Sequence, residues 1–358
     1  MKKLISLISI VLLCCVCLWG CALFPEADST SQVTTLPISS EDTGLTLHFI
    51  DVGQGDCTLI ESKGCFALID AGEYSEANRV VSYLSKEGVT SLEFIISTHP
   101  HSDHCGGLSQ VIRTFDTGVL ISPDADYDST TWEYVLDAAD ERGVQHYTPE
   151  LYDTFQVGAA TLTVLSPAPD AVYSNLNNYS IVTMVEYGNT SFMLTGDAET
   201  IVEKELIRSS YDLSADVLKC GHHGSSTSTC EAFLQKVNPS AAIISCGKDN
   251  DYGHPHQEIT DLLREYEIPM WRTDLSGTII AKSDGKEIYI STASDTSAIE
   301  KATNDPSAPA YIGNKNSKVF HLPACGSVSE MSDKNKVNFQ SREDAVGAGY
   351  KPCGSCDP

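Results

Sequence analysis

The sequence predicts a large α/β domain and a second, much smaller domain at the C-terminus. A chain of 358 residues is too long for one small domain, and short apolar strands with interspersed helices follow one another through its middle. Many of these strands end in an aspartate, a histidine or a glycine. We therefore expect the chemistry of the protein where the strands of the large domain meet their loops.

The first 21 residues differ from the rest of the chain. Lys2 and Lys3 precede an apolar run over residues 4–18, and Gly20 stands directly before Cys21. A basic start, an apolar run shorter than the roughly 20 residues of a membrane span and a small residue before the cut predict an export signal. The cysteine resembles that of bacterial lipoprotein signals, which implies lipidation at Cys21 and anchoring on the outer face of the cell membrane.

Two segments rich in serine, threonine, proline and acidic residues divide the remaining chain. The first, residues 22–44, predicts a solvated tether, and the second, residues 293–309, predicts a linker. Between them lies the large domain, residues 45–292, and after them the small domain, residues 310–358.

The large domain begins with two short strands, LTLHFIDVG and CFALIDAG, which each close on an aspartate and a glycine turn. EANRVVSYLSKEG has helical spacing and a terminal glycine, and QEITDLLREYE is an amphipathic helix. Further strands are predicted at EFIIST, ATLTVLSP, SIVTMVEYG, TSFMLTGD, DVLKCG and AAIISCG.

One loop concentrates metal-binding side chains. Residues 94–107 read FIISTHPHSDHCGG and contain His99, His101, Asp103 and His104. In a tight loop after a strand, the first two histidines can converge on one point while Asp103 and His104 turn toward another. Neutral imidazole and carboxylate are ligands of first-row divalent metals. The HxHxDH spacing therefore predicts a metal site rather than a polar loop with incidental histidines.

The HxHxDH pattern resembles the signature of the metallo-β-lactamase superfamily, and the resemblance continues along the large domain. LIDAG, with Asp70, resembles the motif whose aspartate supports the metal ligands, and MLTGDAE resembles the motif whose aspartate, Asp197, bridges two metals. LKCGHHGS contains His222 and His223, one of which would complete the second metal. The resemblance implies a four-layer αβ/βα sandwich of two mixed β-sheets and two divalent ions, zinc or manganese.

Five motifs narrow the resemblance to ComEC-type competence proteins, and related phosphorylcholine esterases share much of the pattern. In order, they are HFIDVGQGD, NNYSIV, LTGDAE, DVLKCGHHGS and YGHPH. Where many superfamily members carry a third histidine for the first metal, this chain has NNYS, so we expect Asn178 and Ser180 near the metals without assigning them as ligands. Asp51 and Asp56 either line the site or cap a loop. His254 and His256 either support the site or contact phosphate, the alternative being surface positions.

Two divalent ions would generate hydroxide near neutral pH for attack on phosphorus or a carbonyl carbon. Asp103, Asp197 and His254 are the candidate catalytic residues. The resemblance favours a phosphodiesterase or nuclease. Two alternatives are a metallo-hydrolase of lactones, esters or amides, and a non-catalytic surface binding protein that works through its tail.

The charge of the large domain argues against a long polyanion as substrate. Residues 45–292 contain 14 Lys and Arg against 37 Asp and Glu, a formal charge of −23, to which two dications restore only +4. A long nucleic acid is attracted by basic surface, and this average field repels it. Small phosphodiesters, wall-linked phosphodiesters or nucleic acid fragments are therefore the expected substrates.

The sequence of the small domain predicts a separate zinc site. His321 and Cys325, then Cys353 and Cys356 after 27 intervening residues, supply four ligands for a closed tetrahedral site. The segment resembles the zinc-binding domain of Ada DNA-repair proteins, in which the first ligand is a methyl-accepting cysteine. Here that position is His321, which has no thiolate to accept a methyl group, so methyl transfer is excluded. The resemblance then implies a structural zinc or a contact with DNA. With 6 Lys and Arg against 5 Asp and Glu, DNA contact has weak support; a Cys353–Cys356 disulfide is the alternative to zinc.

Overall fold

The computed structural model describes residues 44–125, 127, 129–292, 311–321, 325–329, 331–339 and 341–354, together with a two-residue strand at 33–34. The predicted signal with Cys21, the linker and Cys356 lie outside the described residues. Among the residues described, none of the helices combines the length and the apolar character of a membrane span.

The first of two large sheets contains nine strands in the order β1-β18-β17-β2-β3-β4-β6-β8-β9. It is antiparallel from β18 to β4 and parallel from β4 to β9, so it is a mixed sheet. Its strands are β1 (Val33–Thr34), β2 (Leu45–Phe49), β3 (Thr58–Ser62), β4 (Cys65–Ile69), β6 (Ile95–Ile96), β8 (Val119–Ile121), β9 (Gln145–Tyr147), β17 (Ile279–Ser283) and β18 (Ile288–Thr292).

The second sheet contains seven strands that follow one another in chain order, β10 to β16. It is also mixed: an antiparallel meander from β10 to β13 continues in parallel from β13 to β16. Its strands are β10 (Thr154–Val157), β11 (Ala160–Val164), β12 (Thr183–Tyr187), β13 (Thr190–Leu194), β14 (Val217–Lys219), β15 (Ala241–Ile244) and β16 (Met270–Arg272).

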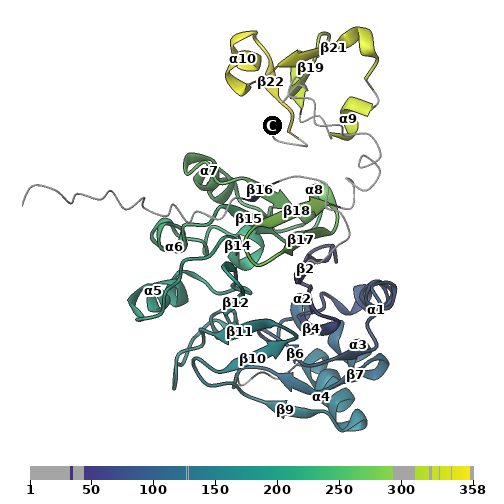
Figure 1. Ribbon diagram of the computed structural model, residues 1–358, viewed down its shortest axis with the longest axis vertical. Helices are drawn as coiled ribbons and strands as arrows, with labels where there is room; N and C mark the ends of the chain where they lie inside the picture. Colours follow the sequence, from purple (N-terminus) through teal and green to yellow (C-terminus); the bar gives the residue numbers. More distant parts are fainter. Residues whose placement is uncertain are drawn as a thin grey trace, which may run out of the picture. The chain divides into compact units, whose positions relative to one another are not determined.

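The two sheets face each other and helices cover their outer faces (Figure 1). A shared apolar core, which includes Phe49 and Phe192, lies between the sheets. A second core packs α1, α3 and α4 on the first sheet, and a third packs α5, α6 and α7 on the second. These helices are α1 (Ala77–Lys86), α3 (Leu108–Thr114), α4 (Thr130–Arg142), α5 (Thr200–Arg208), α6 (Glu231–Val237) and α7 (Gln257–Glu265). The predicted four-layer sandwich of two mixed sheets is confirmed.

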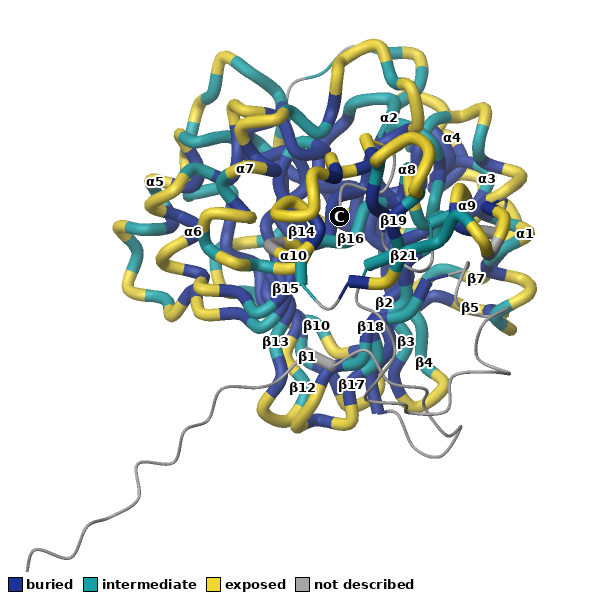
Figure 2. The backbone as a smooth tube through the Cα atoms, turned by 90° about the horizontal axis from the view of Figure 1, so that it is seen from above, coloured by how far each residue is buried: buried dark blue, intermediate teal, exposed yellow. Residues whose placement is uncertain are grey.

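Local sequence explains why the outer helices bury one face. In α1 the buried residues Ala77, Val80 and Leu84 recur at intervals of three and four, while most intervening positions are exposed or half-buried. The α4 helix begins at Ser129, whose hydroxyl accepts the Trp132 amide, and ends at a left-handed Gly143. Figure 2 shows exposed segments along these helices and buried residues in the sheets.

The smaller elements of this domain are η1 (Tyr74–Glu76), α2 (Ser102–Cys105), η2 (Leu176–Tyr179), η3 (Gly221–Gly224), α8 (Thr273–Ser276) and the strand pair β5 (Ser91–Leu92) and β7 (Asp116–Thr117).

The C-terminal domain is a four-stranded sheet in the order β21-β19-β20-β22, with short helices. Its small core consists of Phe320, Phe339, Ala345 and Tyr350. The α+β class predicted for this domain is confirmed. Its elements are β19 (Tyr311–Asn314), β20 (Val319–His321), α9 (Gly326–Ser329), η5 (Asp333–Asn335), β21 (Lys336–Phe339), α10 (Arg342–Gly347) and β22 (Lys351–Pro352).

Candidate metal centre

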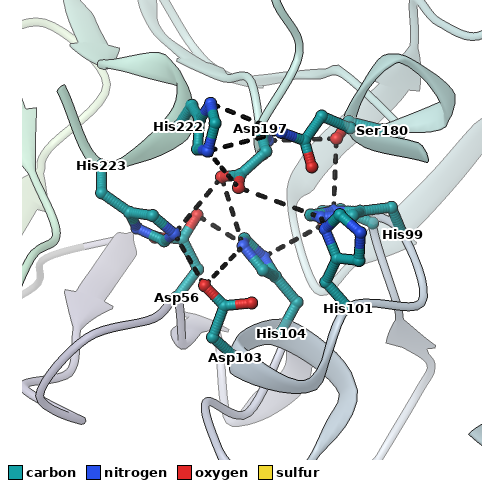
Figure 3. A network of polar contacts seen from close by, with 12 residues as sticks. Asp56, His99, His101, Asp103, His104, Ser180, Asp197, His222 and His223 are labelled. Atoms are coloured by element: carbon teal, nitrogen blue, oxygen red, sulfur yellow. Dashed lines mark hydrogen bonds and ion pairs between the residues drawn. The ribbon is translucent and has the colours of Figure 1, made fainter. Parts of the chain in front are cut away.

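Most of the predicted site residues of the large domain lie close together (Figure 3). Asp70 follows β4, the HxHxDH motif follows β6, and Asp197 and the His222–His223 pair follow β13 and β14. Because β4 and β6 run parallel, the first two segments leave the first sheet at one edge, and the parallel β13 and β14 do the same in the second sheet. Contacts of Asp197 with His104 and His99 join the two edges. The second half of the motif is not an extended loop, since residues 102–105 form the helical turn α2.

Asp70 holds the histidine loop from behind. Its Oδ1 accepts the Thr98 amide at 2.8 Å, and its Oδ2 accepts the Thr98 hydroxyl at 2.7 Å. The same Oδ2 lies 2.8 Å from Nδ1 of His104, which is fully buried. A carboxylate at Nδ1 places a proton there and leaves Nε2 of His104 as the nitrogen that faces the centre and is available to a metal.

Four donors surround one point, and we call Asp103, His104, Asp197 and His223 the Asp103 group. His104 Nε2 lies 3.2 Å from Asp197 Oδ1 and 3.9 Å from Asp103 Oδ2. His223 Nε2 lies 3.2 Å from Asp103 Oδ2 and 3.5 Å from Asp197 Oδ1. Among the described residues, His104 Nε2 and Asp197 Oδ1 are buried without a hydrogen bond. Buried polar atoms normally have a partner, and a divalent cation would supply it, so this donor set fits a metal.

A second set of donors includes the other carboxylate oxygen of Asp197. We call its members, His99, His101 and Asp197, the His99 group. His99 Nε2 lies 2.9 Å from His101 Nδ1 and 3.9 Å from Asp197 Oδ2. Ser180 lies behind them: its hydroxyl accepts the Asp197 amide at 3.0 Å and is 3.3 Å from His99 Nδ1. Ser180 therefore orients two members of the group and faces the ring nitrogen of His99 that points away from His101.

The adjacent histidines of HHGS point to different places. His223 faces Asp103 and Asp197 Oδ1. His222 Nε2 lies 3.7 Å from Asp197 Oδ2, and its Nδ1 contacts the Thr227 hydroxyl at 3.2 Å. Both residues have left-handed backbones, with φ of 51° and 56°, which is costly for non-glycine residues and typical of functional sites. Of the two, the structure places His223 with Asp103.

Asp56 lies on the Nδ1 side of the His223 ring. Its Oδ1 lies 3.4 Å from His223 Nδ1, the nitrogen that also faces the Ser245 carbonyl oxygen at 3.0 Å. Asp56, His104, Asp197 and His223 have donor atoms within 4.8 Å of one another. Asp56, however, approaches the Nδ1 atoms of His104 and His223, which face away from Asp103. We therefore regard Asp56 as a support of the ligands.

Lys219 is the site residue that the sequence analysis did not select. It is buried at the end of β14, pairs with the carboxylate of Asp56 and donates to the Gly196 carbonyl at 3.1 Å. A lysine inside an apolar strand, just before CGHHGS in a strongly acidic chain, was the available signal.

The electrostatics of the site favour positive charge at its centre. Burial opposes ionisation of Asp197 and Asp103, but positive charge on His104 and His223 outweighs it and lowers the pKa of both carboxyls. Burial alone would lower the pKa of His104 and His223, but the carboxylates in turn raise it. Burial and the neighbouring His104 lower the pKa of His99, which keeps it in its neutral, metal-binding form. Burial also opposes the charges of Asp56 and Lys219, but each partner stabilises the other, so the pKa of Asp56 falls to about 2 and that of Lys219 rises.

An open pocket of about 300 Å³ lies over the donor groups, and its lining includes Asn177, Tyr252 and His254. The His254 ring lies 5.4 Å from that of His222, and its Nδ1 is buried without a hydrogen bond among the described residues. Burial and the imidazoles of His223 and His222 lower the pKa of His254 to about 4, so it is neutral near pH 7.

The remaining predicted residues lie outside this pocket. Asp51 accepts the Gly53 amide and caps its loop. Asn178 bonds Glu199 through both its amide nitrogen and its carbonyl oxygen, so its neighbour Asn177 is the asparagine that lines the pocket. His256 accepts the Ser226 amide at 2.9 Å and lies at the N-terminal boundary of α7, to which its side chain makes no hydrogen bond.

The C-terminal domain holds a second donor cluster. One donor atom each of His321, Cys325 and Cys353 lie within 4.8 Å of one another, and Cys325 Sγ is 3.4 Å from His321 Nδ1. Imidazole and thiolate in this arrangement suit tetrahedral zinc. Cys356, the fourth predicted ligand, is outside the described residues.

Comparison with known proteins matches both domains. Residues 50–248 match the metallo-beta-lactamase superfamily and residues 297–358 the metal binding domain of Ada. The chain is 34% identical over 287 residues to ComE operon protein 3 of Bacillus subtilis, which covers 75% of this chain and 35% of that protein. It is 34% identical over 235 residues to Recombination protein 2 of Haemophilus influenzae, covering 64% of this chain and 28% of that protein. It is 29% identical over 231 residues to Competence protein ComA of Neisseria gonorrhoeae, covering 64% and 31%.

The chain thus spans about a third of the length of these relatives. The family match covers more than half of the chain and includes every member of the two donor groups described above. The resemblances to the metallo-β-lactamase superfamily, to the competence proteins and to the Ada zinc-binding domain are confirmed. The chain belongs to the metallo-β-lactamase superfamily, as a metal-dependent hydrolase related to the competence proteins, and it ends in an Ada-like metal-binding domain.

Proposed function

We propose that the protein is an exported, lipid-anchored phosphodiesterase with two divalent ions, zinc or manganese, acting on small, wall-linked or short nucleic acid phosphodiesters outside the cell. The observation that carries this proposal is the sharing of Asp197 by two donor groups. Its Oδ1 faces His104 and His223, and its Oδ2 faces His99. A carboxylate between two donor sets is suited to bridge a pair of ions.

The side chains of the site have three roles: they would hold the ions, orient the ligands and transfer a proton. The His99 group would hold one ion and the Asp103 group the other; when bound, two divalent ions supply an activated water and positive charge for an anionic substrate. Asp70 keeps Nε2 of His104 aimed at the centre, and Asp56 does the same for His223. Neutral His254 lines the pocket, where its ring would accept a proton and return it to the leaving group.

The pocket also limits the substrate. Among the described residues, no lysine or arginine lines it, so phosphate contacts would be confined to the metal positions and to polar groups such as the Asn177 amide. The names of the relatives refer to competence and recombination, which supports a nucleic acid phosphodiester as one substrate. The formal −23 of residues 45–292 favours short fragments over long strands.

The salt dependence of hydrolysis tests whether the substrate is a short phosphodiester or a long strand. The protein loaded with Mn²⁺ or Zn²⁺ should hydrolyse bis(p-nitrophenyl) phosphate or a dinucleotide at rates that change less than about threefold between low and physiological ionic strength, because few phosphates are contacted. Long single-stranded DNA should be cleaved more slowly per bond. Tight, steeply salt-dependent binding with efficient cleavage of long strands would instead support a strand-tracking nuclease. Preferential hydrolysis of a lactone would favour the lactone, ester or amide hydrolase.

For the C-terminal domain we propose a structural zinc held by His321, Cys325, Cys353 and Cys356, and contact with DNA as a second, less supported role. One of its lysines, Lys318, lies over the Tyr350 ring at 4.4 Å and is engaged within the domain. Gel-shift titration with the isolated metal-loaded protein and short duplex DNA would measure that contact.

His321→Ala should separate the two metal-binding domains functionally. The variant should lose zinc from the C-terminal domain and lower its thermal stability, because small domains depend on such a staple. Hydrolysis of a small phosphodiester should stay within about twofold of wild type, because the pocket residues belong to the other domain. Loss of hydrolysis in this variant would contradict the division into two independent sites.

A further inference from the structure

Lys219 is a buried cation beside the metal centre. Its side chain is 3% exposed, and no other lysine or arginine in the described part of the chain is buried. Lysine is rarely buried unless it is paired, so a specific role is indicated. Lys219 does not line the pocket, which excludes direct substrate contact in this structure.

The ammonium group of Lys219 joins segments from both sheets. On one side it pairs with Asp56, from the loop between β2 and β3, and Asp56 lies 3.4 Å from His223 Nδ1. On the other side it donates to the Gly196 carbonyl at 3.1 Å. Gly196 directly precedes Asp197, and its carbonyl also accepts the His222 amide at 3.1 Å. One side chain therefore contacts the supports of both His223 and Asp197.

The orientation of His223 depends on this arrangement. Its Nδ1 lies between two acceptors, the Ser245 carbonyl and Asp56, so Nδ1 carries a proton and Nε2, which faces Asp103 and Asp197, is the nitrogen available to a metal. Asp56 can serve as acceptor at low cost only if its own charge is balanced, because an unpaired buried carboxylate is strongly destabilising. Lys219 supplies that balance near two further carboxylates, Asp197 and Asp70, whose negative charge also stabilises its ammonium group.

We propose that Lys219 is a positioning residue of the metal centre: through Asp56 and Gly196 it holds His223 and Asp197 in the geometry that binds the metal of the Asp103 group. This inference rests on the metal centre of the proposed function but on no particular substrate. Because Lys219 acts through ligands and lies outside the pocket, its loss should affect metal affinity and kcat more than KM.

Lys219→Met tests the proposal, since methionine keeps an unbranched apolar chain and removes the charge. Zinc affinity, measured by competition with a chromophoric chelator, should fall roughly 10- to 100-fold for one of two equivalents. The kcat for bis(p-nitrophenyl) phosphate should fall by a similar factor, with less than about a threefold change in KM. Lys204→Met, which removes an exposed lysine from α5, is the matched control and should behave as wild type.

A second variant keeps the test decisive if Lys219→Met does not fold. Asp56→Asn preserves shape and should weaken the same zinc equivalent, while the double variant should lose no more than the worse single variant, because the two residues act as a unit. Wild-type zinc affinity in both single variants, with lower thermal stability alone, would show a purely structural ion pair and overturn the inference. A wild-type protein that binds no zinc or manganese would instead overturn the metal centre itself.

Discussion

Replacing Asp197 with alanine should abolish turnover while leaving the fold intact. Asp197 belongs to both donor groups, with Oδ1 3.2 Å from His104 Nε2 and Oδ2 3.9 Å from His99 Nε2. Its removal takes a ligand from each metal position, so the loss of kcat should exceed the roughly 100-fold expected for losing an outer support. The fold should survive because Ser180 bonds the backbone amide of residue 197, which alanine retains.

Hydrolysis of bis(p-nitrophenyl) phosphate, elemental analysis and thermal unfolding together check this result. Metal content should fall below that of wild type, while the circular dichroism spectrum stays unchanged. Asp137→Ala, which removes an exposed carboxylate from α4, is the matched control and should keep both metal content and activity. Full hydrolysis by the Asp197→Ala protein, or by wild type stripped of metal, would refute the metal mechanism.

His223→Asn should be far more damaging than His222→Asn. His223 Nε2 lies 3.2 Å from Asp103 and 3.5 Å from Asp197, whereas His222 contacts Asp197 only at 3.7 Å. Asparagine is the matched replacement because it tolerates the left-handed backbone that both histidines adopt. We expect the first variant to lose one metal equivalent and more than about 100-fold in kcat, and the second to lose about tenfold or less.

Metal stoichiometry and single-substrate kinetics on the two variants decide between the neighbours. If His222→Asn lost the metal and His223→Asn kept it, the ring orientations described above would not be those of the working site. Equal losses in both variants would indicate that His222 also binds a metal, at the Asp197 Oδ2 side.

The sequence by itself determined the fold class and most of the donor set. HxHxDH lies within six residues, so its spacing alone indicates which side chains share a loop, and the motifs around Asp70 and Asp197 mark strand ends. The alternation of short strands and amphipathic helices likewise depends on local patterns, so it predicted an α/β domain. The four-layer sandwich was implied by the resemblance to the superfamily.

Only the tertiary structure decided how distant segments meet. Asp103 and His223 are 120 residues apart, and which of two adjacent histidines faces the aspartate depends on two positive φ angles that no spacing encodes. Lys219 looks like one more strand residue until the fold brings it to Asp56 and Gly196. Local sequence predicts where a side chain leaves the backbone, but the partner that balances a buried charge comes from long-range packing.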